Sequence, residues 1–95
     1  MLSERKFIQK IVRQTGEKFD CICWAMDNGV NRPSWNICID DYDLYRSEEF
    51  RQWSSTWHST FRNNYDHSQF SIVFCYCNPI ENNLWEYSQK SKLIM

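Results

Sequence analysis

Four aromatic residues recur at helical spacing between Ser47 and Tyr65, and this stripe limits the possible folds more than any other feature of the chain. Successive members lie three, four and four residues apart, which places every ring on one side of a helix; they are Phe50, Trp53, Trp57 and Phe61. Trp, Phe, Ser and Thr are only moderate helix formers, so tertiary packing of the rings must stabilise this helix. The rest of the chain must therefore supply an apolar surface that covers the stripe.

The start of this helix and the side opposite the rings carry separate signals. Ser47 is placed to cap the first turn, and Glu48 and Glu49 lie at the positive end of the helix dipole. The opposite side is uncharged at four positions, which are Gln52, Ser55, Thr56 and Ser59. Such a face is usually a plain solvated one. The alternative is a face that packs on a partner, because the centres of protein interfaces are depleted in charge.

A second helix is predicted near the N-terminus, over Glu4 to Thr15. Ser3 can cap it, and Gly16 is placed to end it in a left-handed conformation. Its apolar side consists of Phe7, Ile8, Ile11 and Val12. Both predicted helices thus have one apolar side to bury.

Three segments alternate as strands do: Phe19 to Met26, residues 35–40, and Gln69 to Cys77. The turn signal Asp27-Asn28-Gly29 joins the first two as a hairpin. The third is apolar on both faces and so is predicted to be central in the sheet. Residues 84–87 are a candidate short edge strand, and residues 88–95 are expected to form a loosely ordered tail.

These elements predict a small α+β sandwich in one domain spanning residues 1–95, in the order α-β-β-α-β with a further β optional. Two helices on one face of a three- to four-stranded, mainly antiparallel sheet bury both apolar stripes in the simplest way. The sixteen aromatic residues (6 Phe, 5 Trp and 5 Tyr) compensate for the short chain, because each ring buries a large apolar area.

Charge and composition restrict the functional classes. The net charge of −1 gives no general attraction to nucleic acid or to anionic membranes. No segment has the roughly 20 apolar residues of a membrane span, and the N-terminus lacks the apolar stretch of a signal peptide. With an odd number of five cysteines, we expect reduced thiols and a cytoplasmic location.

The cysteines form two Cys-x-Cys pairs, Cys21/Cys23 and Cys75/Cys77, with Cys38 alone. If the two strands were neighbours, four thiols could converge, and zinc prefers thiolate ligands. Zinc sites more often use Cys-x-x-Cys on turns, and reduced cysteines behave as small buried apolar residues. We therefore expect core packing, with no metal and no cofactor.

The acidic segment from Asp40 to Glu49 carries a charge of −4 over ten residues. Its carboxylates are the candidate partner-binding residues Asp40, Asp41, Asp43, Glu48 and Glu49. Clustered carboxylates can bind hard cations, but the segment has no glycine for a tight cation loop. A solvated loop is a second alternative, and a docking surface for a basic, nucleic-acid-binding partner is the third.

No catalytic arrangement is recognisable, so the chain is not expected to be an enzyme. His58 lies beside the aromatic stripe and His67 in the loop after it, and both are expected to be structural. A small RNA-binding sheet would need exposed aromatics in basic surroundings. The candidates for such stacking are Trp24, Trp35, Tyr76, Trp85 and Tyr87, but residues 19–49 sum to −5.

In size, mixed α/β organisation and an acidic surface near a helix start, the chain resembles compact inhibitors made by mobile elements. These include phage anti-CRISPR and other anti-defence proteins, and antitoxin-like immunity proteins against nuclease toxins. The resemblance implies a non-enzymatic protein that covers a partner's basic nucleic-acid site with carboxylates, without itself binding nucleic acid or membrane. A small metal-binding or Cys-dependent enzyme is the alternative, and an RNA-binding module is the third hypothesis.

Overall fold

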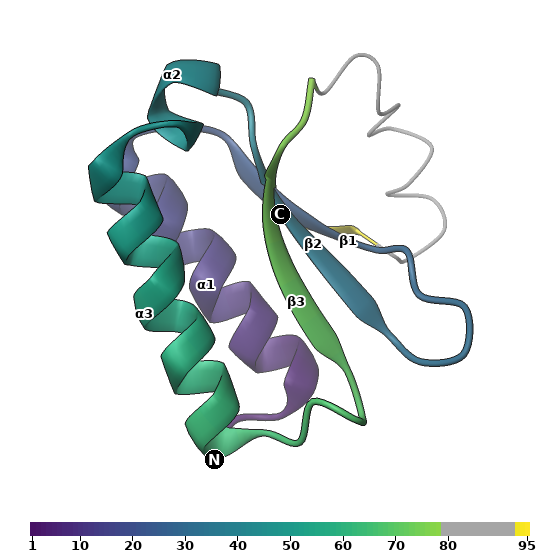
Figure 1. Cartoon of the computed structure of the whole chain (residues 1–95). Coiled ribbons are helices and arrows are strands. Elements are labelled where there is room, and N and C mark those ends of the chain that lie inside the picture. Colours follow the sequence, from purple (N-terminus) through teal and green to yellow (C-terminus); the bar gives the residue numbers. More distant parts are fainter. Residues whose placement is uncertain (79–92) are drawn as a thin grey trace.

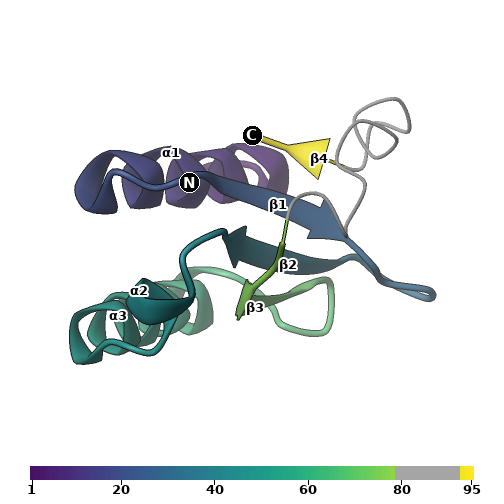
Figure 2. The same ribbon diagram turned by 90° about the horizontal axis from the view of Figure 1, so that it is seen from above.

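The computed structural model describes residues 1–78 and 93–95, and these residues form two layers (Figures 1 and 2). Helices α1 (Glu4–Phe19) and α3 (Glu48–Asn64) lie side by side against one face of a four-stranded sheet. The strands are β1 (Cys23–Asp27), β2 (Ser34–Ile39), β3 (Ser71–Tyr76) and β4 (Leu93–Ile94). A one-turn helix, α2 (Tyr42–Tyr45), precedes α3. The predicted α+β sandwich is confirmed.

The sheet has the order β3-β2-β1-β4 and is mixed. Strand β1 pairs antiparallel with both β2 and β4, so the predicted hairpin is present and most pairs are antiparallel. Strands β2 and β3 pair in parallel, with Cys38 opposite Cys75. A parallel pair needs a long crossover, and α2 and α3 provide it.

The aromatic stripe of α3 lies in the core, as predicted. Phe50, Trp57 and Phe61 are buried, and the ring of Phe7 in α1 lies 5.9 Å from Trp57 and 6.4 Å from Phe61. Trp53 is half-buried, and its Nε1 donates a hydrogen bond of 2.9 Å to Thr15 Oγ1. The N-cap is also confirmed, because the Phe50 N–H donates to Ser47 Oγ at 3.1 Å. Ring packing and the hydrogen bond from Trp53 to Thr15 thus help to join the two helices.

Alternate residues of the strands separate into two apolar layers, as the sequence pattern predicts. The layer beneath the helices includes Cys23, Ala25 and Ile37. On the opposite face, Trp24 and Met26 form a second buried cluster with Cys38, and Cys75, Cys77 and Leu93 pack against it. This second cluster gathers three of the five cysteines.

The end of α1 differs from the prediction. The helix continues past Gly16 to Phe19, and Asp20 takes the left-handed conformation with φ 50° and ψ 50°. The extra turn places the Phe19 ring 5.7 Å from Phe50 and 5.6 Å from Trp53. Packing of Phe19 on the stripe thus accounts for the longer helix, and β1 begins later, at Cys23.

The third strand is at an edge of the described sheet, so the prediction of a central position was wrong. Its apolar outer residue Val73 is 45% exposed, whereas Ile72 and Phe74 are buried. The candidate edge strand over residues 84–87 lies outside the described residues. Residues 93 and 94 were expected in a loose tail, but they form β4, and Ile94 is only 3% exposed; residues 88–92 lie outside the described part.

Candidate functional site

Three of the five predicted carboxylates, Asp40, Asp41 and Asp43, lie around one surface depression of about 550 Å³. The helix-ending Asp20 joins them from a distant part of the sequence. The remaining lining residues are Cys21, Ile22 and Tyr42. We call this feature, with its seven lining residues, the acidic depression.

Two of its carboxylates also shape the local backbone. Asp40 Oδ1 accepts a hydrogen bond of 3.1 Å from the Ile22 N–H, which joins the start of the hairpin to its end. Asp41 Oδ1 accepts from the Leu44 N–H at 3.0 Å and so caps α2. The segment predicted as a loop therefore contains a helical turn, and these two carboxylates are held in fixed positions.

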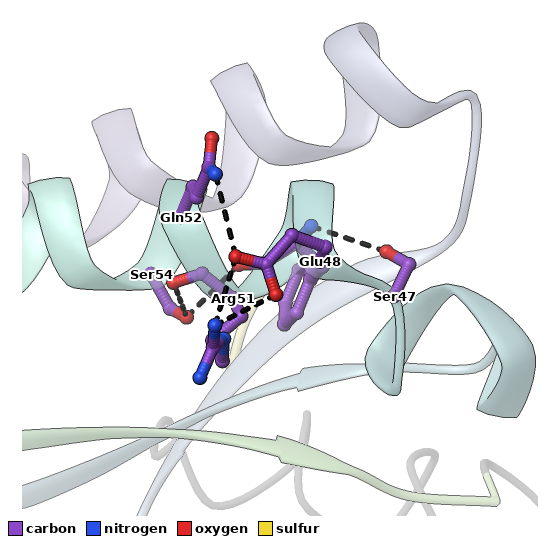
Figure 3. A network of polar contacts seen from close by, with 6 residues as sticks. Ser47, Glu48, Arg51, Gln52 and Ser54 are labelled. Carbon is purple, nitrogen blue, oxygen red and sulfur yellow. Dashed lines mark hydrogen bonds and ion pairs between the residues drawn. The ribbon is translucent and has the colours of Figure 1, made fainter.

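The other two predicted residues, Glu48 and Glu49, lie outside the acidic depression and are engaged elsewhere. Glu48 accepts hydrogen bonds from Arg51 at 2.8 Å and Gln52 at 3.3 Å (Figure 3). The Arg51 hydrogen bond is the main cause that lowers the pKa of Glu48. Glu49 lies 3.7 Å from Lys18 Nζ. Of the five predicted residues, three therefore line the acidic depression and two pair with neighbouring side chains.

The charges of the acidic depression act together on Cys21. Burial raises the pKa of this thiol first, and the negative charges of Asp40, Asp41 and Asp20 raise it further. Two apolar side chains are open to solvent between these charges, with Ile22 51% and Tyr42 50% exposed. The depression thus combines negative potential with exposed apolar surface, which suits the head and the aliphatic stem of Lys or Arg.

A second group of reactive side chains lies on the sheet face away from the helices. Cys38 Sγ lies 3.1 Å from Cys75 Sγ and 3.0 Å from Cys77 Sγ, and the last two sulfurs are 3.7 Å apart. We call these residues the thiol cluster. The sequence had suggested convergence of Cys21 and Cys23 with Cys75 and Cys77. That does not occur, because β2 lies between β1 and β3 and brings Cys38 instead.

The three thiols of the cluster differ in pKa, in part because of the hydrogen bonds among them. Donation from Cys38, with a smaller contribution from Cys77, lowers the pKa of Cys75 to about 7 despite its burial. The pKa of Cys38 is raised, mainly because its proton is held in the bond to Cys75. Burial raises the pKa of Cys77. Cys75 is thus the thiol of the group that loses its proton most readily.

The two histidines lie in different environments, one packed against the sheet and one exposed. The His58 ring packs 5.5 Å from Phe74, and burial followed by the charge of Arg62 lowers its pKa. His67 is exposed. Within residues 1–78 and 93–95, neither histidine hydrogen-bonds to a cysteine, a serine or a carboxylate.

Stacking of RNA bases would need exposed rings. Trp24 and Trp35 are buried, and the Trp35 indole N–H donates to Glu4 at 2.9 Å. Tyr76 is partly exposed but contacts the Tyr42 ring edge-to-face at 5.3 Å. Trp85 and Tyr87 lie outside the described residues. The described part therefore offers no open aromatic platform on the sheet.

None of the helices in the described ranges is long and apolar enough to cross a membrane. Comparisons of the chain with protein-family models, with curated proteins and with solved structures find no match. The acidic depression and the thiol cluster are therefore the two features of the described residues that bear on function.

Proposed function

We propose that this protein is a non-enzymatic interaction protein that binds a basic, nucleic-acid-binding partner through the acidic depression. The observation that carries the proposal is the convergence of Asp20, Asp40, Asp41 and Asp43 around one depression. By covering Lys and Arg side chains that otherwise hold phosphates, the protein acts as an inhibitor of its partner. This is the mode expected of anti-CRISPR, other anti-defence and immunity proteins.

Preorganisation supports this role. The hydrogen bonds from the Ile22 and Leu44 N–H groups fix Asp40 and Asp41 before any partner arrives. Less side-chain freedom is then lost on binding, which favours affinity. The clustered charge raises the association rate with a basic surface, and exposed Ile22 and Tyr42 provide apolar area to bury.

The test uses variants that remove charge but keep the local hydrogen bonds. In Asp41→Asn/Asp43→Asn, the asparagine that replaces Asp41 can still cap α2, because asparagine is a good N-cap residue. Asp43 is exposed and no hydrogen bond or ion pair is seen for it in the described structure. The matched control Glu17→Gln/Asp66→Asn changes the charge equally at exposed positions outside the acidic depression.

Each protein is used as bait in cell extract, and retained proteins are challenged with duplex DNA or RNA. The proposal predicts that wild type and control retain the same basic protein, that nucleic acid displaces it, and that Asp41→Asn/Asp43→Asn retains much less of it. If Asp41→Asn/Asp43→Asn retains the partner as well as the control does, the acidic depression is only a solvated surface. The uncharged α3 face at Gln52, Ser55, Thr56 and Ser59 then becomes the better candidate.

A further inference from the structure

The thiol cluster lies on regular, hydrogen-bonded strand backbone. Cys38 and Cys75 are direct neighbours across the parallel β2–β3 pair. Cys77 follows on the same side of the strand, and its N–H donates to the Ile39 carbonyl at 3.1 Å, which keeps the chain beside β2. Sheet register therefore brings all three cysteine side chains together on one side of the sheet, as a preorganised ligand set requires.

The sulfur separations suit a shared ion. A metal ion with metal–sulfur bonds of about 2.3 Å in tetrahedral geometry sets neighbouring sulfurs about 3.8 Å apart. The cluster has separations of 3.0, 3.1 and 3.7 Å. Each sulfur pair therefore needs to open by less than about 1 Å, which small side-chain rotations can supply.

The chemistry of the donors is also appropriate. We infer that Cys38, Cys75 and Cys77 form a three-thiolate binding site for a soft metal ion, Zn²⁺ or Cu⁺, which is independent of the proposed docking function. Thiolates are the ligands that select these ions over hard cations such as Mg²⁺. On binding, each remaining S–H proton is released to solvent as an S–metal bond forms.

The exposure of the thiol cluster and the different locations of the other two cysteines support this assignment. Cys75 and Cys77 are only partly buried, so an ion can reach them, whereas Cys38 closes the inner side. Cys23 packs in the core beneath the helices, and Cys21 lies at the acidic depression. The chain thus provides its own control cysteine, Cys21, with partial exposure like that of Cys75 and Cys77.

The experiment titrates the reduced, metal-free protein of 95 residues with Co²⁺, then displaces the Co²⁺ with Zn²⁺, and separately titrates the protein with Cu⁺ against a competing chelator. The inference predicts a thiolate-to-cobalt charge-transfer band that saturates at one ion per chain, or one tightly held Cu⁺ per chain. Cys77→Ser should weaken binding by at least about tenfold, since changes around a ligand already cost that much. Cys21→Ser should bind as wild type does.

Circular dichroism and a thermal melt of Cys77→Ser and Cys75→Ser/Cys77→Ser ensure that only folded variants are compared. Cys75 and Cys77 are better positions for substitution than Cys38, because they are partly exposed and Cys38 is buried. Binding that is unchanged in folded Cys75→Ser/Cys77→Ser overturns the inference. So does the absence of stoichiometric binding by the reduced wild type for all three ions. A disulfide within the cluster that forms under mild peroxide in a protein that binds no ion also overturns it.

Discussion

The proton of Cys75 is the most labile of the cysteine protons with a resolved pKa, because the hydrogen bond to Cys38, and to a smaller extent the contact with Cys77, lowers the pKa of Cys75. The thiolate is the nucleophilic form, so alkylation of a cysteine follows its pKa. In metal-free protein, we expect the iodoacetamide rate at Cys75 to reach half its maximum near pH 7. The rate at Cys21 should still be rising above pH 9.0, since burial and nearby aspartates raise its pKa from that value.

Peptide mass spectrometry after timed alkylation separates the two sites. Cys21 serves as the internal control, because both side chains are partly exposed. Coincident pH profiles at the two cysteines would contradict the hydrogen-bonded arrangement of the thiol cluster.

A substitution of Trp57 tests whether the aromatic stripe forms the core. It is 8% exposed and packs edge-to-face on Phe7 and Trp53. We expect Trp57→Ala to lower the free energy of unfolding by about 3–5 kcal/mol, as truncation of other buried large rings does. Val30→Ala, at a position 96% exposed, is the control and should change it by less than about 0.5 kcal/mol. Urea denaturation measures the free energy of unfolding of both variants. If Trp57→Ala lowers it no more than Val30→Ala does, the stripe does not lie in the core.

Among the elements, β4 makes β1 an interior strand of the described sheet. Ile94 lies opposite Ala25 and joins the core beneath the helices. We therefore expect Ile94→Ala to cost about 2–4 kcal/mol of unfolding free energy. Met95→Ala, one residue later and mostly exposed, should be nearly neutral. A melt in which both variants match wild type would mean that the C-terminal residues do not pair with β1 in solution.

The sequence predicted those elements whose side-chain period is strong. The stripe of α3 was readable because only one face of this helix is buried. Strands β1 and β2 are apolar and largely buried on both faces, and they were readable from their alternation and from the turn signal between them. The end of α1 was not, because the contact of Phe19 with Phe50 and Trp53 is tertiary. The parallel pairing of β3 with β2 was hidden for the same reason, since strand order is not a local property.

The sequence likewise predicted only part of the acidic depression and of the thiol cluster. Asp40, Asp41 and Asp43 were found because they are close in sequence, whereas Asp20 lies beside them only in the folded chain, where Ile22 and Asp40 are hydrogen-bonded. α2 was missed because one helical turn is too short to show periodicity. The position of Cys38 between the other cysteines required the order β3-β2-β1, which no local pattern reveals.

Across the whole molecule, charge is unevenly distributed. Residues 1–18 sum to +3 and residues 19–49 to −5, although the net charge is only −1. A partner approaching from outside the Debye length, about 10 Å at 0.1 M salt, senses little of this field, and at lower salt the field acts further. The acidic depression should therefore affect mainly the association rate and its salt dependence.

The most direct test of the docking function is the association rate of the captured basic partner, measured by stopped flow over a range of salt concentrations. We expect the wild-type rate to fall steeply with salt, as does that of Glu17→Gln/Asp66→Asn. The Asp41→Asn/Asp43→Asn variant should associate more slowly at low salt, with a shallower slope, and approach the wild-type rate at high salt. If Asp41→Asn/Asp43→Asn and wild type associate at the same rate at every salt concentration, the acidic depression is not the docking surface.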